Sequence, residues 1–134
     1  MTTETTVLKR KPYEPFVTAR GDQMTYHLPV ESGFRSLMFT FVITADQLAV
    51  LEADEERYYF LFAILHRRYQ MQSPAFAPKT DRHFDLVLFG AVAEVERLLN
   101  LEDAEGHGAV SNLIRITMGR DQQRMRNGNW FLNQ

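Results

Sequence analysis

Three side chains of the types that transfer protons or bind metals lie two positions apart, at Asp81, His83 and Asp85. On a β-strand this spacing would place them on one side, whereas residues two apart on a helix do not face each other. Carboxylates in the first turn of a helix also serve as caps, and their negative charge interacts favourably with the positive end of the helix dipole. Because capping is the commoner role, we predict no catalytic or metal-binding residue here. A small enzyme or ligand-binding protein that uses His66, His83 and Asp85 is the alternative.

The remaining candidates for chemistry are isolated. His66 ends a predicted helix, where an imidazole suits the carbonyl end of the dipole. His107 lies between Gly106 and Gly108, in a loop that could approach a ligand or be solvated. The chain has no cysteine, which excludes disulfides, thiol catalysis and Cys-ligated zinc. It also lacks a nucleophile elbow, a phosphate loop and a dinucleotide-binding fingerprint, so we expect no cofactor.

Three helices are predicted to position these residues. Thr44 and Gln47 have the spacing of a capping box, which predicts a short helix after Thr44. The next helix, Asp54–Tyr69, is apolar around its whole circumference and is therefore expected at the centre of the core. A third helix is predicted over Asp81–Asn100. Gly90 weakens its middle, which indicates close packing against another backbone.

Strands are predicted before and after these helices along the chain. Residues 24–43 alternate between apolar and polar side chains around a glycine turn, as in an antiparallel hairpin. Alternation over residues 112–118 favours a further strand, and the Asn-Gly turn that follows predicts that Trp130 returns in a last one. Residues 1–20 are expected to form an extended or flexible arm. The fold class is therefore a single α+β domain over residues 21–134, with the sheet packed against about three helices.

Composition agrees with one globular domain. The chain has 134 residues, 45% of them hydrophobic and 24% charged, with a formal net charge of -2. No apolar run approaches the roughly 20 residues that span a bilayer. No secretory signal precedes the domain, so we expect a cytoplasmic protein without membrane contact.

Charge is segregated along the chain. Residues 46–56 and 94–105 are acidic, whereas the segment from Arg115 onward is basic. A second alternative is therefore an RNA-binding module that uses Arg115, Arg120, Arg124 and Arg126, although the acidic balance of the chain argues against nucleic acid.

The stretch Phe41–His66 resembles the strand, capped short helix and longer helix of some small stand-alone bacterial immunity proteins. The resemblance lies in the pattern of residues and transfers no individual residue. It implies a non-enzymatic inhibitor that binds a cognate toxin.

We therefore expect a non-catalytic protein-binding module, a candidate immunity protein that binds and occludes a bacterial toxin or effector. Segregated charge steers association with a complementary protein. The sequence leaves open which face binds and the oligomeric state. The candidate contacts are Glu52, Glu55, Glu56 and His107 on acidic segments, or Arg120, Arg124 and Trp130 on the basic one.

Overall fold

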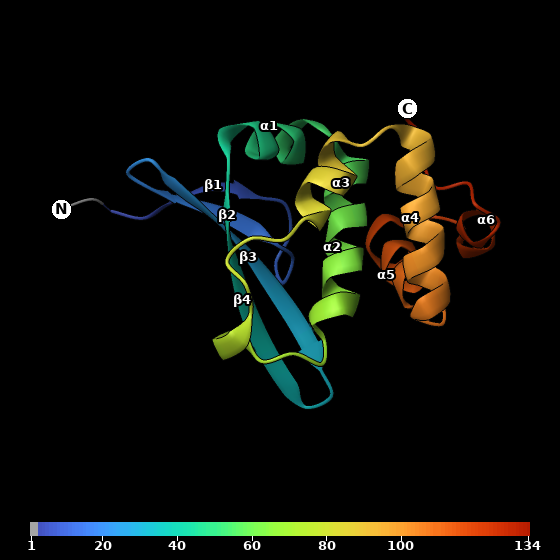
Figure 1. The fold of residues 1–134 in the computed structure, drawn as a ribbon, viewed down its shortest axis with the longest axis horizontal. Coiled ribbons are helices and arrows are strands. Elements are labelled where there is room, and N and C mark those ends of the chain that lie inside the picture. Colours follow the sequence, from blue (N-terminus) through green and yellow to red (C-terminus); the bar gives the residue numbers. More distant parts are fainter. Residues whose placement is uncertain (1–2) are drawn as a thin grey trace.

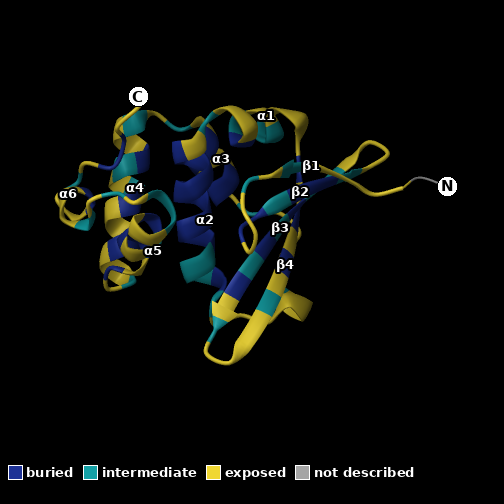
Figure 2. Ribbon diagram, turned by 180° about the vertical axis from the view of Figure 1, so that it is seen from behind, coloured by how far each residue is buried: buried dark blue, intermediate teal, exposed yellow. Residues whose placement is uncertain are grey.

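Helix α2 (Glu55–Tyr69) is the centre of the molecule, between a β-sheet and a second group of helices (Figure 1). The computed structural model describes residues 3–134. Every residue from Glu56 to Leu65 is buried, including two charged ones, and the ribbon of α2 is dark along most of its length in Figure 2. The all-round apolar pattern thus identified the central helix correctly, because both of its sides are covered.

The sheet is an antiparallel meander with strands in the order β1-β2-β3-β4. Cα pairing from Met24↔Ile43 to Ser32↔Arg35 confirms the hairpin predicted over residues 24–43. Alternate side chains such as Tyr26, Leu28 and Phe39 are buried on the α2 side of the sheet. The strands are β1 (Thr5–Lys9), β2 (Phe16–Arg20), β3 (Gln23–Ser32) and β4 (Arg35–Ile43).

We expected an extended or flexible arm over residues 1–20. Within this range, residues 5–9 and 16–20 form β1 and β2 of the sheet. Residues 1 and 2 lie outside the described part. Pro12 and Pro15 lie between the two strands, where a missing amide costs no ladder hydrogen bond. This connection is fixed to the helices, because Arg10 Nη2 donates to the Leu51 carbonyl at 2.8 Å and Tyr59 Oη donates to Glu14 Oε1 at 2.7 Å.

Both predicted helix starts near the sheet are confirmed. The Thr44–Gln47 capping box opens α1, and Asp54 Oδ1 accepts from the Arg57 amide at the start of α2. Besides α2, the helices are α1 (Ala45–Ala53), the 3-10 helix η1 (Pro74–Phe76), α3 (His83–Phe89), α4 (Val92–Glu105), α5 (Ala109–Met118) and α6 (Gln122–Arg126).

The helix predicted over residues 81–100 is in fact two helices, α3 and α4, which separate at Gly90. Gly90 has extended backbone angles, φ -69° and ψ 153°. A Cβ at this position would lie 2.3 Å from the carbonyl oxygen of Leu86, so the close backbone approach at Gly90 is to the last turn of its own helix and not to another element. The Gly90 carbonyl instead accepts from Arg57 Nη1 at 2.7 Å. The buried arginine therefore stabilises the break.

The predicted C-terminal strands are wrong, since residues 109–118 and 122–126 form α5 and α6. Val110 and Ile114 are one helical turn apart and both are fully buried, which overrides the alternation over residues 112–118. Trp130 is also buried but belongs to no strand. Among the described residues, no helix is both long and apolar enough to cross a membrane.

Candidate functional site

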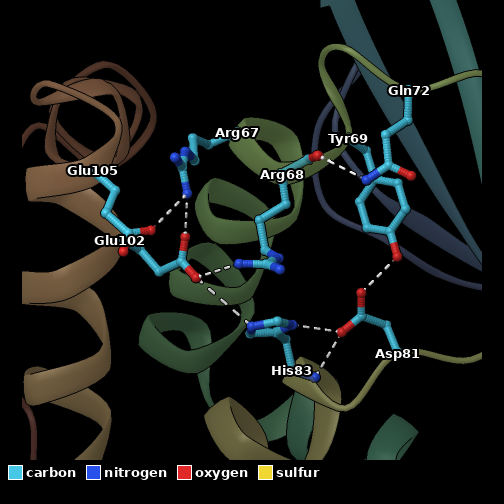
Figure 3. Close-up of polar contacts among 8 residues, drawn as sticks. All are labelled: Arg67, Arg68, Tyr69, Gln72, Asp81, His83, Glu102 and Glu105. Carbon is cyan, nitrogen blue, oxygen red and sulfur yellow. Dashed lines mark hydrogen bonds and ion pairs between the residues drawn. The ribbon is translucent and has the colours of Figure 1, made fainter.

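The predicted Asp81–His83 pair belongs to a polar cluster between α2, α3 and α4, which we call the His83 network (Figure 3). Asp81 Oδ1 accepts from the backbone amide of His83 at 2.7 Å and from its ring Nδ1 at 2.6 Å. Tyr69 Oη donates to the other carboxylate oxygen of Asp81 at 2.6 Å. Since a carboxylate only accepts, its contact with Nδ1 places a proton on that ring nitrogen.

Glu102 closes the network on the side of α4. Its two carboxylate oxygens accept from Arg67 Nη1 and Arg68 Nη1, each at 2.7 Å. One of them also lies 3.7 Å from His83 Nε2. Glu105 lies 3.6 Å from Arg67 and extends the network toward the end of α4 (Figure 3). The network members are Arg67, Arg68, Tyr69, Asp81, His83 and Glu102.

These contacts fix the ionisation of Asp81 and Tyr69. Burial alone would raise the pKa of Asp81, but hydrogen bonds from His83 and Tyr69 outweigh it and hold this pKa well below its usual range. Burial and the hydrogen bond to Asp81 raise the pKa of Tyr69. Asp81 is therefore an acceptor and Tyr69 a donor at neutral pH. His83 is only 2% exposed and contacts carboxylates at both ring nitrogens. Since the network contains residues of α2, α3 and α4, it joins these three helices.

The three residues of the enzyme alternative do not meet. His66 accepts a hydrogen bond from the Glu31 amide at 3.3 Å, near the turn of the β3–β4 hairpin. Asp85 is exposed and accepts from Gln47 Nε2 at 2.8 Å. Within the described residues, no three His, Asp or Glu side chains are grouped so that they could hold a metal ion. The structure thus gives His66, His83 and Asp85 three separate sets of partners.

Two candidate contact residues are not at the surface. Glu56 is 1% exposed and accepts from Arg120 Nη1 at 2.9 Å and from the amides of Leu132 and Asn133 at 2.6 and 3.1 Å. Trp130 is fully buried, and its indole donates to the side chain of Asn100. Both therefore hold the C-terminal segment in place, a role that their spacing in the sequence does not reveal.

The other predicted contacts are scattered. Glu52 and Glu55 are exposed at the end of α1 and the start of α2, whereas His107 is exposed in the α4–α5 loop and Arg124 on α6. These four stay predictions as partner contacts. Arg120 is less available, since its guanidinium pairs with buried Glu56.

The arginines of the RNA alternative are largely engaged. Besides Arg120, Arg126 lies 3.8 Å from Asp103, and Arg115 donates to Asn112 at 2.8 Å. A hollow beside α4 and α6 includes Arg126, but none of the other three arginines is among its lining residues. This hollow therefore does not bring the four arginines together.

An exposed apolar surface, which periodicity did not reveal, lies across α1, α3 and the first half of α4. Phe89 and Leu86 of α3 are 51% and 42% exposed. Phe89 borders one hollow of about 500 Å³ and another of about 280 Å³. We call this surface the Phe89 face; its apolar residues are Ala49, Val50, Ala53, Leu86, Phe89 and Leu98.

The position of Phe89 follows from the break at Gly90. Phe89 is the last residue of α3, and Arg57 Nη1 donates to the carbonyls of Val87 and Gly90 on either side of it. These hydrogen bonds fix the end of α3 against α2. α1 lies beside α3 in Figure 1, and the chain passes from α3 into α4 at the same end of the molecule. The Phe89 face is thus built on a rigid support.

No protein-family model, curated protein or solved structure matches the chain.

Proposed function

We propose that the protein is a non-catalytic protein-binding module that docks through the Phe89 face. The observation that carries the proposal is Phe89 itself, a half-exposed aromatic residue that borders two hollows. Exposed apolar patches with polar rims mark interaction sites, and aromatic residues are enriched in protein interfaces. Among such modules, we propose an immunity protein that occludes a bacterial toxin or effector, as the resemblance of residues 41–66 implies.

The energetics of Phe89 support an anchoring role. Burying a phenylalanine completely is worth about 1.5–3 kcal/mol, and about half of its surface is still available here. The hollows on either side admit side chains of a partner, so the ring would be enclosed rather than merely covered. Centrally placed and fully enclosed residues contribute most of the binding energy in protein interfaces.

The interior supports a binding role over a catalytic one. The ionisable groups of the His83 network satisfy one another, and His83 is buried. A catalytic base must come within hydrogen-bond reach of a substrate proton. The Phe89 face, in contrast, is accessible and largely apolar.

Affinity capture from a native lysate tests the proposal. The bait proteins are wild type, Phe89→Ser, Leu86→Ser and the control Ile116→Ser, which alters a 63% exposed residue on α5. We expect wild type and the control to retain one stoichiometric protein that both face variants lose, with all four baits folded by circular dichroism. Equal retention by the face variants, or copurified nucleic acid in its place, would refute docking through this face.

The inhibitor class has its own test. The captured protein is expressed in cells together with the wild type or with Phe89→Ser. An immunity protein restores growth as the wild type and fails to do so as the variant. A captured protein that is harmless when expressed alone would contradict the inhibitor class and leave the docking face intact.

A further inference from the structure

The charged residues around the Phe89 face define the chemistry of its partner. The two hollows are lined by three carboxylates, Asp54, Asp85 and Glu94, and by one cation, Arg57. Arg57 is buried, and its Nε lies 3.2 Å from Asp54 Oδ2, so these two charges offset each other. Asp85 and Glu94 are exposed. The lining of the face therefore carries a net charge of about two negative units.

Helical geometry places further charged residues beside the apolar ones. Asp85 precedes Phe89 by four positions on α3, and Asp46 precedes Val50 by four positions on α1. Arg82, at the start of α3, has the same relation to Leu86, so it offsets the charge of Asp46 and the net charge stays at about two negative units. Residues four apart lie on the same side of a helix. Both helices therefore present an exposed carboxylate one turn before an apolar residue of the face.

We infer that the Phe89 face binds a basic protein surface, in which lysine or arginine side chains surround an apolar socket for Phe89. This inference rests on the proposed function and specifies its partner. Cations on that surface would pair with Asp85 and Glu94, while the socket encloses the ring. Complementary charge accelerates association and makes it sensitive to salt. The same carboxylates would repel the phosphates of a nucleic acid.

Synthetic peptides test the inference without the natural partner. The isotopically labelled protein is titrated, by two-dimensional NMR, with short peptides of alternating lysine and leucine, glutamate and leucine, or lysine and serine. We expect the lysine–leucine peptide to shift the amide signals of Leu86, Phe89 and Glu94 most. The lysine–serine peptide should bind more weakly, and the glutamate–leucine peptide should not bind.

Charge variants provide the matched control. Asp85→Asn combined with Glu94→Gln should weaken binding of the lysine–leucine peptide roughly tenfold at low salt, the order expected for two exposed charge pairs. Glu4→Gln combined with Asp22→Asn changes the net charge equally, but at exposed positions just before β1 and in the turn between β2 and β3. This control should bind like the wild type.

Three results would overturn the inference: equal binding of the glutamate–leucine peptide, equal weakening by both double variants, or shifts centred away from α3. These outcomes are separate from those of the capture experiment. If Phe89→Ser abolishes capture while the peptides show no preference for lysine, the docking face stands and the basic partner is excluded. If Phe89→Ser retains the captured protein, the proposed function itself fails.

Discussion

Substitution of Glu56 tests how the C-terminal segment is held against the start of α2. Its carboxylate is buried in the first turn of α2 and accepts three hydrogen bonds, from Arg120 and from the backbone amides of Leu132 and Asn133. Glu56→Ala removes all three acceptor contacts at once. Arg120 is left partly buried without its counter-ion, and two amides lose their partner.

The size of the effect follows from these contacts. A hydrogen bond to a charged group contributes about 1.5–3 kcal/mol, and breaking a buried ion pair costs about 3–5 kcal/mol. Because the three contacts share one carboxylate, their contributions are not additive. We expect Glu56→Ala to lower the free energy of unfolding by about 3–5 kcal/mol. Domains of this kind have only about 5–15 kcal/mol in total.

Urea denaturation followed by fluorescence measures this loss directly. Trp130 is the only tryptophan, and it lies two residues before Leu132 in the segment that Glu56 holds. Release of the segment should therefore shift the emission of Trp130 to longer wavelength before global unfolding. Glu55→Ala changes the exposed neighbouring carboxylate and should stay within about 0.5 kcal/mol of the wild type. A loss below about 1 kcal/mol for Glu56→Ala would refute the reasoning.

Three further outcomes are expected. Asp81 has a lower pKa in the folded than in the unfolded protein, so its stabilising effect is present above about pH 4 and is lost as the pH falls. Urea midpoints should therefore decline less steeply on acidification in Asp81→Asn than in the wild type. Parallel curves for the two proteins would contradict this. Burial lowers the pKa of His27 and His66, so NMR titrations should place both titration midpoints below the ordinary value of 6.5. The contribution of each neutral imidazole to the stability of the fold is then present above pH 6.5 and is lost as the pH falls below it. A midpoint above 6.5 for either histidine would contradict the lowered pKa of that residue. Gly90→Ala would press a Cβ against the Leu86 carbonyl, so we expect the free energy of unfolding, measured by urea denaturation, to fall by about 1–3 kcal/mol. An unchanged urea midpoint would show that α3 can shift to accommodate the methyl group.

Local signals in the sequence were sufficient for the part of the fold nearest the sheet. The Thr44–Gln47 box and the Asp54 cap are contacts within one turn, so their spacing alone predicts two helix starts. Alternation over residues 24–43 likewise sets both the faces and the pairing of β3 and β4, since successive side chains in a strand point to opposite sides. These features depend on close neighbours in the chain.

The C-terminal third could not be predicted in the same way. Its helices and tail are defined by contacts with distant residues: Val110 and Ile114 are buried in the core, and the amides of Trp130 and Leu132 bind the carboxylates of Glu96 and Glu56. A short segment with few apolar residues fits both a strand and a helix until its packing partner is known. Tertiary contacts therefore decided the structure there.

The candidate sites show the same division. A contact between Asp81 and an amide at the start of the helix that follows it was predictable. The bond from Tyr69 to Asp81 and the position of Glu102 near His83 join residues far apart in sequence. Phe89 is the last residue of α3, and it is half-exposed one position before the break at Gly90. Surface exposure at such a position depends on how neighbouring helices end, which periodicity does not report.

The fastening of the C-terminal segment to the beginning of α2 has a consequence for biosynthesis. The sheet and α2 can associate once residue 69 has been made, but the side of α2 that carries Glu56 and that the C-terminal segment covers is then open to solvent. The donors to Glu56, at residues 120, 132 and 133, are added only later in translation. A nascent chain is therefore expected to leave this side of α2 uncovered until these residues leave the ribosome, and to be most open to proteolysis or chaperones during that interval.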